Sequence, residues 1–298
     1  MDAKQRLKLV ERYRVEDGKA FRLKRYATDD KAGLNSSKQE MADLLREAVE
    51  RLSEIQDKLY AQDRWAVLCI FQAMDAAGKD GAIKHVFSGV NPQGCHVTSF
   101  KAPSTLERDH DFLWRHATNL PSRGMIGIHN RSWYEEVLVA RVHPELLDKQ
   151  KLPPELRAHK RIYDERLEDI AAFERYLARQ GVLILKFFLH VGKDEQYRRF
   201  LARIEEPEKN WKFSADDVAE RRHWDAYQDA YDAAIRATAA PHAPWYVVPA
   251  DSKPFARLVV SVALSEALDA LDLHYPRLDE AERRALEEAR KALVAEGD

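Results

Sequence analysis

The stretch from Trp65 to Gly81 reads WAVLCIFQAMDAAGKDG and decides the fold of this chain. Its first half is a short, nearly continuous apolar run, which is typical of a strand buried on both faces. Its second half is a tight glycine-containing turn that carries Lys79, and a helical apolar pattern follows at Ile83 and Val86. Strand, turn, lysine and helix in this order predict a phosphate-binding loop, in which backbone N–H groups and the helix dipole face phosphate oxygens.

The match to the loop consensus, G-x-x-x-x-G-K-[ST], is incomplete. Ala73 stands in place of the first glycine, and Asp80 stands in place of the Ser or Thr that binds Mg²⁺. Asp75 lies inside the loop, where bound phosphates would destabilise a carboxylate unless a metal ion or an incoming hydroxyl offsets the charge. We therefore predict Asp75 to be a Mg²⁺ ligand or a general base. The alternative interpretation is a helix start with a surface lysine.

Four further apolar runs predict strands, and helical patterns lie between them: 95–100, 125–129, 182–189 and 245–248. Ser37 and Glu40 form a capping-box pattern before a long amphipathic helix, and the stretch 155–179 is helical and ends at Gly181. Alternating strands and helices indicate parallel pairing with helices on both faces. We predict an α/β protein of three layers, α/β/α, in which helices cover both faces of a parallel five-stranded sheet.

The chain divides into three segments on composition and pattern. Residues 1–36 are charged, lack periodicity, and are expected to be an extension draped over the core or partly mobile. Residues 37–275 form the predicted main domain, in which a cation-rich segment at about 196–222 is expected to be a flap over the site. Residues 276–298 hold a final amphipathic helix that packs on the body or on another subunit.

Composition excludes several classes of protein. The 298 residues carry 48 Lys and Arg against 50 Asp and Glu, a net charge of -2, so no globally basic nucleic-acid binder is expected. No apolar run approaches the ~20 residues of a membrane helix, and the N-terminus lacks the apolar core of a signal peptide. The two cysteines, Cys69 and Cys95, are expected to be free thiols. We expect a cytoplasmic protein with neither nucleic-acid nor membrane partners.

A second motif, GIHNRSWYEE at 127–136, begins where a candidate strand ends. Ligands bind at the carboxyl edge of open parallel sheets, so polar residues there are candidates for a site. Asn130 is a candidate to hold a metal-bound water or a substrate oxygen, and Arg131 to bind phosphate with its planar guanidinium. Ser132 is interpreted as a helix N-cap.

Over about residues 10–275, the chain resembles the polyphosphate kinase 2 family. The resemblance rests on several separated motifs in the right order: QAMDAAGKDGAIKHV (72–86), GVNPQG (89–94), SFKAPS (99–104), HDFLWR (110–115), HNRSWYEEVLVARVHP (129–144), RRFLARIEEPEKNWKFSADD (198–217) and APWYVVPAD (243–251).

The resemblance implies a three-layer α/β/α P-loop kinase fold with a helical lid, in which residues 37–275 are the kinase domain and the flap at about 196–222 is the lid insertion. It also implies that the protein moves phosphoryl groups between inorganic polyphosphate and nucleotides with Mg²⁺. The family loop G-x-D-x-x-G-K is matched by Asp75, Gly78 and Lys79, whereas Asn130 replaces the Asp of an Asp-Arg-Ser motif. The Asn-Arg-Ser form with Glu135 and Glu136 is similar to the class III branch, which accepts nucleoside mono- and diphosphates. The matching basic lid positions are Arg199, Arg203, Lys209, Lys212 and Arg221.

These considerations give one set of expected site residues. The catalytic candidates are Asp75, Lys79, Asn130 and Arg131, with Asp75 as the Mg²⁺ ligand. The phosphate-binding candidates are Ala76, Ala77, Gly78, Asp80, Gly81 and Lys84, together with the lid residues Arg199, Arg203, Lys209, Lys212 and Arg221. Lys101, Arg115 and Glu135 are the candidates for nucleotide binding.

The expected ligands are inorganic polyphosphate, AMP, ADP, ATP and, as further candidates, guanine nucleotides, and the chain is expected to form a dimer or tetramer. Two alternatives stay open: a nucleoside monophosphate kinase that uses an NTP donor, and a catalytically inactive module that binds polyphosphate or nucleotide. The sequence does not decide the net direction of the reaction or the preferred base.

Overall fold

The computed structural model describes residues 1–297, and its centre is a six-stranded sheet in the order β1-β6-β5-β2-β4-β3. Five of the strands are parallel, as the sequence predicts. Their bounds are β2 Ala66–Ala73, β3 Cys95–Ser99, β4 Ile126–Asn130, β5 Val182–His190 and β6 Trp245–Pro249.

The two central strands explain the apolar composition of the motif region. Every residue of β2 is buried, because helices cover both faces of the sheet at this position. Phe71 of β2 stands opposite Phe187 of β5 on one side and Asn130 of β4 on the other. This register brings the ends of the three strands, and the loops after β2 and β4, to one edge of the sheet.

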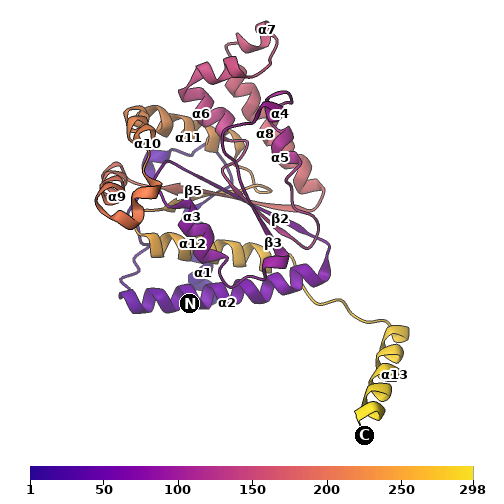
Figure 1. Ribbon diagram of the computed structural model, residues 1–298. Helices are drawn as coiled ribbons and strands as arrows, with labels where there is room; N and C mark the ends of the chain where they lie inside the picture. Colours follow the sequence, from indigo (N-terminus) through magenta and orange to yellow (C-terminus); the bar gives the residue numbers. More distant parts are fainter. Residues whose placement is uncertain (298) are drawn as a thin grey trace.

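Helices form a layer on each face of the sheet (Figure 1). One layer contains α1 Ala3–Tyr13, α2 Lys38–Gln62, α3 Lys79–Val86 and α12 Lys253–Asp269. The other contains α6 Glu135–Val142, α8 Ile162–Arg179 and α11 Trp224–Thr238. Short helices lie in the connections between these elements: η1 Leu23–Arg25, η2 Pro92–Gly94, α4 Thr105–Arg108, α5 Trp114–Ala117, η3 Pro144–Lys149 and α7 Pro154–Arg157.

Most expected boundaries agree with the structure, and one helix differs. Ser37 caps α2 with the predicted capping box, and Gly181 follows α8 with a positive φ of 76°. The stretch 155–179, however, is divided into α7 and α8. No residue of α7 is buried, so the segment has no apolar face with which to continue the packed helix α8.

The N-terminal extension is more ordered than its pattern suggests. Helix α1 begins with a capping box between Asp2 and Gln5 and buries Leu9, Val10 and Tyr13. The two-residue strand β1, Arg14–Val15, then pairs antiparallel with β6 and makes the sheet mixed. The extension is thus draped over the core, which is the first of the two expected arrangements. The sequence shows no periodicity there because the apolar stripe of α1 is short and β1 has only two residues.

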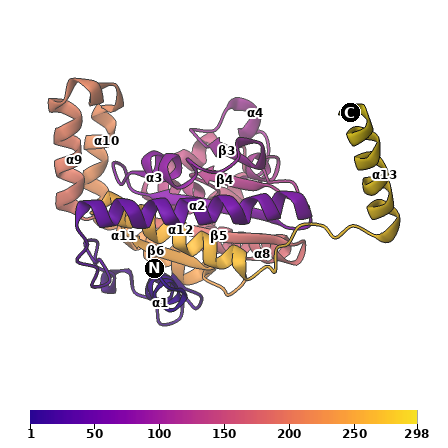
Figure 2. The same ribbon diagram turned by 90° about the horizontal axis from the view of Figure 1, so that it is seen from below.

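Two segments project from the body (Figure 2). The lid comprises α9 Lys193–Glu205, η4 Pro207–Lys212, α10 Ala215–Glu220 and η5 Arg221–His223, and it lies between β5 and α11 in the chain. Helix α13, Glu280–Gly297, stands apart from the body at the end of an extended linker. The last residue of the predicted C-terminal segment, 298, lies outside the described residues.

Two smaller expectations concern cysteines and membranes. Cys69 is buried, Cys95 is half-buried, and both are free thiols. Among the helices of residues 1–297, none combines the length and the apolar composition needed to cross a membrane.

Candidate active site

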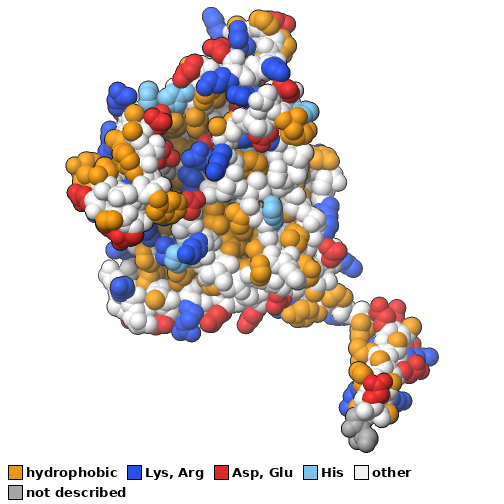
Figure 3. Space-filling model, in the orientation of Figure 1, with side chains coloured by type: hydrophobic (Ala, Val, Ile, Leu, Met, Phe, Trp, Pro, Cys, Tyr) orange, Lys and Arg blue, Asp and Glu red, His pale blue; other side chains and the backbone are white. Residues whose placement is uncertain are grey.

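A cleft of about 970 Å³ opens where β2 and β4 end, between the loop after β2, helices α3 and α12, and the lid. Lys and Arg side chains surround this hollow beside the lid (Figure 3). The catalytic candidates line it together: Asp75, Lys79, Asn130 and Arg131. The phosphate-binding candidates Ala76, Ala77, Gly78, Asp80, Gly81, Lys84, Arg199, Arg203, Lys209 and Lys212 line it as well.

The loop after β2 has the backbone that a phosphate-binding loop requires. Ala76 and Gly78 adopt left-handed conformations, with φ of 59° and 105°, which turn the chain sharply from the strand into α3. Gly78 is the N-cap of α3, and no side chain caps this helix end. The N-terminal N–H groups of α3 therefore face the cleft with the positive end of the helix dipole.

Lys79 folds back over its own loop. Its Nζ donates a hydrogen bond of 2.9 Å to the carbonyl oxygen of Ala73, the residue that replaces the first consensus glycine. The pKa of Lys79 is lowered, mainly by burial and secondly by the positive charge of Arg131. The nearby carboxylates of Asp75, Glu135 and Asp80 partly oppose this by raising it. If Lys79 turned from this carbonyl to an arriving phosphate, the acceptor of its hydrogen bond would change from a neutral to an anionic oxygen. A hydrogen bond between two charged groups is stronger than one to a neutral carbonyl.

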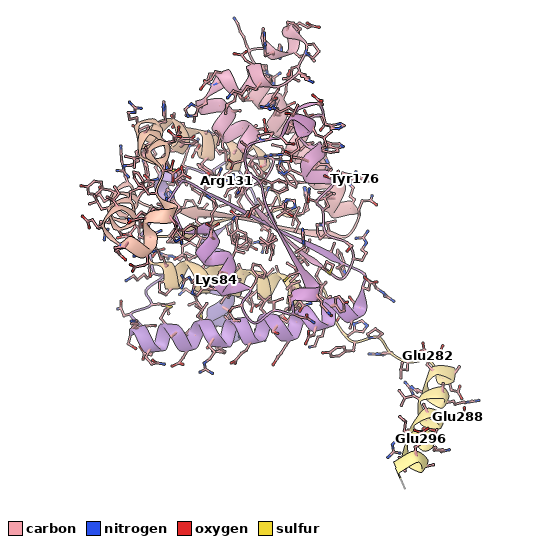
Figure 4. The ribbon with its side chains drawn as sticks, in the orientation of Figure 1. Lys84, Arg131, Tyr176, Glu282, Glu288 and Glu296 are labelled. Atoms are coloured by element: carbon pink, nitrogen blue, oxygen red, sulfur yellow. The ribbon has the colours of Figure 1, made fainter. Side chains whose placement is uncertain are left out.

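Arg131 stands at the centre of a charged group at the mouth of the cleft. Its guanidinium lies 3.7 Å from Asp75 and 3.8 Å from Glu135, and Glu135 in turn accepts a 2.8 Å hydrogen bond from Gln72. The charge of Glu135 is the main cause that raises the pKa of Arg131. Arg131 has a φ of 67°, a conformation rare for a side chain with a Cβ, and its N–H bonds to the carbonyl of Phe71. Figure 4 shows Arg131 at this edge, with Lys84 below it on α3.

Asn130 contacts protein groups in the cleft wall. Its Nδ2 donates to Asp80 Oδ1 at 2.7 Å and to Ser99 Oγ at 3.4 Å. The amide thus fixes the orientation of the Asp80 carboxylate, which is a role that the sequence alone did not suggest.

The lid cations divide into two kinds. Lys209, which is half-buried and pairs with Glu206, and Lys212, which is exposed, both line the cleft. Lys212 lies over the ring of Trp211. Arg199 is buried, and its guanidinium donates to four carbonyl oxygens, those of Ala76, Ala77, Ala250 and Asp251, and to Glu195. The structure therefore places Arg199 as a clamp on the phosphate-binding loop, whereas the sequence suggested a cation directed at substrate.

The two other lid arginines also contact protein groups. Arg203 pairs with Asp217 at 3.1 Å, on the cleft side. Arg221 donates to Gln196 Oε1 and to the carbonyl of Lys193, and it lines a smaller pocket of about 200 Å³ rather than the cleft.

The three nucleotide-binding candidates are not gathered in one place. Lys101 lines the large cleft, and Glu135 lines the smaller pocket, which shares Asp75 and Arg131 with the cleft. Arg115 lines neither of these two cavities. It is buried, donates to the carbonyl of Lys101 at 2.8 Å, and stacks over Phe100, so it supports the segment that carries Lys101.

Sequence reasoning missed several residues of the cleft. Lys253 and Arg257, one turn apart on α12, line it opposite the lid. Burial, together with the charges of Arg199, Lys209 and Arg257, lowers the pKa of Lys253. Their spacing of four residues is the only local signal, and it is equally typical of a solvated helix face.

The lid also brings a carboxylate to the loop. Asp217 of α10 lines both cavities beside Asp75. Burial and the negative charge of Asp75 raise the pKa of Asp217, and its partners Arg203 and Arg131 oppose this effect.

No group of three or more His, Cys, Asp or Glu side chains within residues 1–297 is arranged to hold a metal ion by itself. Asp75 and Asp80 nevertheless place hard oxygen donors at the start of the cleft. Mg²⁺ in phosphoryl-transfer sites is commonly held by one or two carboxylates together with substrate phosphates, so the donor set fits this ion.

Comparisons with known proteins agree on one family. The family model described as polyphosphate kinase 2 matches residues 35–276. The ADP-polyphosphate phosphotransferase of Rhodopseudomonas palustris is 50% identical over 96% of this chain and 98% of its own length. The AMP/ADP-polyphosphate phosphotransferase of Meiothermus ruber is 43% identical over 92% of this chain and 98% of its own length.

A solved structure is similar over almost the same extent. The crystal structure of polyphosphate kinase 2 from Arthrobacter aurescens superposes with a TM-score of 0.83 at 40% identity, covering 92% of this chain and 95% of that one.

Proposed function

Because this chain belongs to the polyphosphate kinase 2 family, we propose that it transfers phosphoryl groups between inorganic polyphosphate and the nucleotides AMP and ADP. The observation that carries the proposal is the meeting of Asp75, Lys79 and Arg131 at one cleft. We extend the expected nucleotides to ATP in the reverse direction, with guanine nucleotides as further candidates. The kinase domain is proposed to be residues 37–275, with the lid near 196–222.

The walls of the cleft suit a chain of phosphates. Polyphosphate carries roughly one negative charge per phosphate and offers neither a base edge nor an apolar face, so cations must supply its binding energy. We assign this role to the cation lane, defined as Lys84, Lys209, Lys212, Lys253 and Arg257, which lines the cleft on a chain of net charge -2.

The transfer itself requires positioning and charge stabilisation more than covalent chemistry. An anionic oxygen of the acceptor phosphate attacks the terminal phosphorus of polyphosphate. The new P–O bond forms as the bond to the shortened polyphosphate breaks, and the leaving oxygen keeps the electron pair. Lys79 and the N–H groups of α3 hold the transferring phosphoryl group, and Arg131 stabilises charge on its equatorial oxygens. The acceptor needs no strong base because its oxygen is already ionised.

We assign the nucleotide to the cleft and the smaller pocket together, because both cavities are lined by Arg131. Lys101 contacts its phosphates from the cleft, with Arg115 supporting Lys101 through the backbone. Glu135 contacts the ribose or base from the smaller pocket, where Tyr227 and Tyr231 supply aromatic walls.

Mg²⁺ is the expected cofactor, and Asp75 with Asp80 are the residues proposed to hold it. When bound, the ion neutralises phosphate oxygens and lowers the repulsion between the two anionic substrates. Asn130 orients Asp80 for this purpose through its 2.7 Å hydrogen bond.

The test is a phosphoryl donor and acceptor assay. The purified full chain is incubated with AMP or ADP plus polyphosphate, without ATP, in the presence and absence of Mg²⁺. Formation of ADP or ATP that depends on polyphosphate supports the proposal. Transfer only from an added NTP would instead identify an NTP-dependent nucleoside monophosphate kinase, and polyphosphate binding without turnover would identify an inactive binding module.

We also propose that helix α13 associates with α13 of a second copy, in a dimer or within a tetramer. Leu286, Leu293 and Val294 are each more than half exposed on this helix, and Leu286 and Leu293 are one heptad apart. Most of the stability of a helix in a protein comes from packing of its apolar face, so the exposed stripe of α13 favours a partner.

The charges of α13 favour an antiparallel pair. Residues 280–288 contain four Glu and two Arg, whereas residues 289–297 contain one Arg, one Lys and one Glu. Antiparallel pairing places the acidic half of one helix against the basic half of the other, and parallel pairing would oppose like charges. Figure 4 shows Glu282, Glu288 and Glu296 along this helix, away from the body.

A further inference from the structure

Asp251, directly after β6, joins three separate parts of the chain. Its Oδ2 accepts a hydrogen bond of 2.7 Å from Thr28 Oγ1 in the N-terminal extension. Its Oδ1 accepts one of 2.7 Å from the backbone N–H of Gly192, the N-cap residue of lid helix α9. The backbone N–H of Asp251 also donates to the carbonyl of Thr28 at 3.1 Å. We call the group of Thr28, Gly192 and Asp251 the Asp251 junction.

Packing at Gly192 shows independently how closely the junction is built. A Cβ at this position would lie 2.9 Å from Thr28 Oγ1 and 3.0 Å from Asp251 Oδ2. Such distances are too short for ordinary contacts, so a side chain at residue 192 would separate Thr28 from Asp251. The absence of a side chain is thus what allows the extension, the lid and the end of β6 to meet.

The first two turns of α9 carry this junction to the phosphate-binding loop. Arg199 donates to the carbonyls of Ala250 and Asp251 at 2.6 and 3.2 Å, and with its other amino group to those of Ala76 and Ala77 at 3.0 and 2.7 Å. Gln196, on the same helix, donates to the carbonyl of Asp75 at 2.9 Å. The start of the lid and the loop around Asp75 are therefore held by one connected set of hydrogen bonds.

We propose that Thr28 and Asp251 are positioning residues for phosphoryl transfer, which hold the start of α9 and, through Gln196 and Arg199, the backbone around Asp75. The N-terminal extension is in this way part of the catalytic apparatus, although residue 28 lies before the region 35–276 that the family model covers. This inference rests on the proposed function for its kinetic consequence. Its structural part, the fixing of α9, stands apart from activity.

The experiment compares Thr28→Val with Thr28→Ser in the full chain. Valine keeps the volume of the side chain and the backbone hydrogen bond to Asp251, but it removes the hydroxyl that donates to the Asp251 carboxylate. Serine keeps the hydroxyl. Because misplacement of the backbone around Asp75 slows phosphoryl transfer, kcat/KM of Thr28→Val should fall roughly tenfold, while that of Thr28→Ser stays near wild type.

A second readout does not require turnover. Amide hydrogen exchange should become faster in residues 192–200 of Thr28→Val and stay unchanged in β2 and β5, because only the start of α9 is released. The proposal is overturned if Thr28→Val exchanges like wild type at 192–200, if both variants lose activity equally, or if exchange rises throughout the sheet. A wild-type protein that turns over no polyphosphate would refute the proposed function, and the exchange experiment would still decide the junction.

Discussion

The carboxylate of Asp75 and the guanidinium of Arg131 lie 3.7 Å apart, although 56 positions separate them in the chain. Asp75 follows β2 and Arg131 follows β4, and the parallel register of these neighbouring strands brings both to the same edge. Each is partly exposed to the cleft, so the pair is open to substrate. The sequence motifs of two separate loops thus form one charged centre.

Arg131→Lys should lower kcat about tenfold or more with little change in stability. Lysine keeps the positive charge but lacks the planar, forked donor set that stabilises equatorial phosphate oxygens. Steady-state kinetics with polyphosphate and ADP measure the effect. Arg141→Lys on α6, whose guanidinium stacks on Tyr163 away from the cleft, is the matched control. Unchanged kcat in Arg131→Lys would remove Arg131 from the transfer step.

Lys79→Ala and Asp75→Asn should each abolish transfer, with a loss of at least about 100-fold in kcat, and leave the fold intact. Lys79 is the only lysine within the loop and helix start, and Asp75 supplies the carboxylate proposed to hold Mg²⁺. Circular dichroism and thermal unfolding verify the fold. Near-normal turnover in either variant would show that the chemistry lies elsewhere.

Lys253→Ala and Arg257→Ala should raise the KM for polyphosphate several-fold and change the KM for the nucleotide much less. Each substitution removes one charge from the cation lane, so the salt dependence of polyphosphate binding should also become less steep. Lys38→Ala, at an exposed position at the start of α2, is the control. If the nucleotide KM rises as much as that for polyphosphate, the lane does not belong to polyphosphate alone.

The hydrogen bond between His143 and Glu220 of lid helix α10 should make the stability of the folded protein depend on pH. Burial alone would lower the pKa of His143, but the 3.0 Å hydrogen bond with Glu220 and its charge raise it above the usual 6.5. The pKa of Glu220 is lowered in return, despite burial. A raised histidine pKa stabilises the folded state fully below pH 6.5, while Glu220 is ionised, and the effect is lost as pH rises through the raised value.

His143→Gln should therefore lower the thermal midpoint more at pH 6 than at pH 9. His159→Gln, in an exposed pair with Glu165 outside the lid, is the matched control for removal of a histidine. A midpoint difference that is the same at both pH values would contradict this assignment.

Leu286→Glu combined with Leu293→Glu should shift the chain to a smaller assembly, because two charges would enter the apolar stripe of α13. Light scattering coupled to size-exclusion chromatography measures the mass. Arg283→Gln, a polar replacement on the same helix, should keep the wild-type mass. An unchanged assembly in the double variant would show that α13 does not join the copies.

The sequence by itself determined the five parallel strands, the glycine turn after the first of them and the start of α2, because buried strands, glycine turns and helix caps leave local patterns. It also predicted that Asp75, Lys79 and Arg131 would lie at one edge of the sheet, because residues that follow neighbouring parallel strands meet there. Only the tertiary structure showed that Arg199 clamps the loop, that Lys253 and Arg257 enter the cleft, and that Thr28 reaches Asp251. Those roles depend on contacts between segments distant in the chain, and a charged or hydroxyl side chain has the same local pattern whether it faces solvent, substrate or a carbonyl.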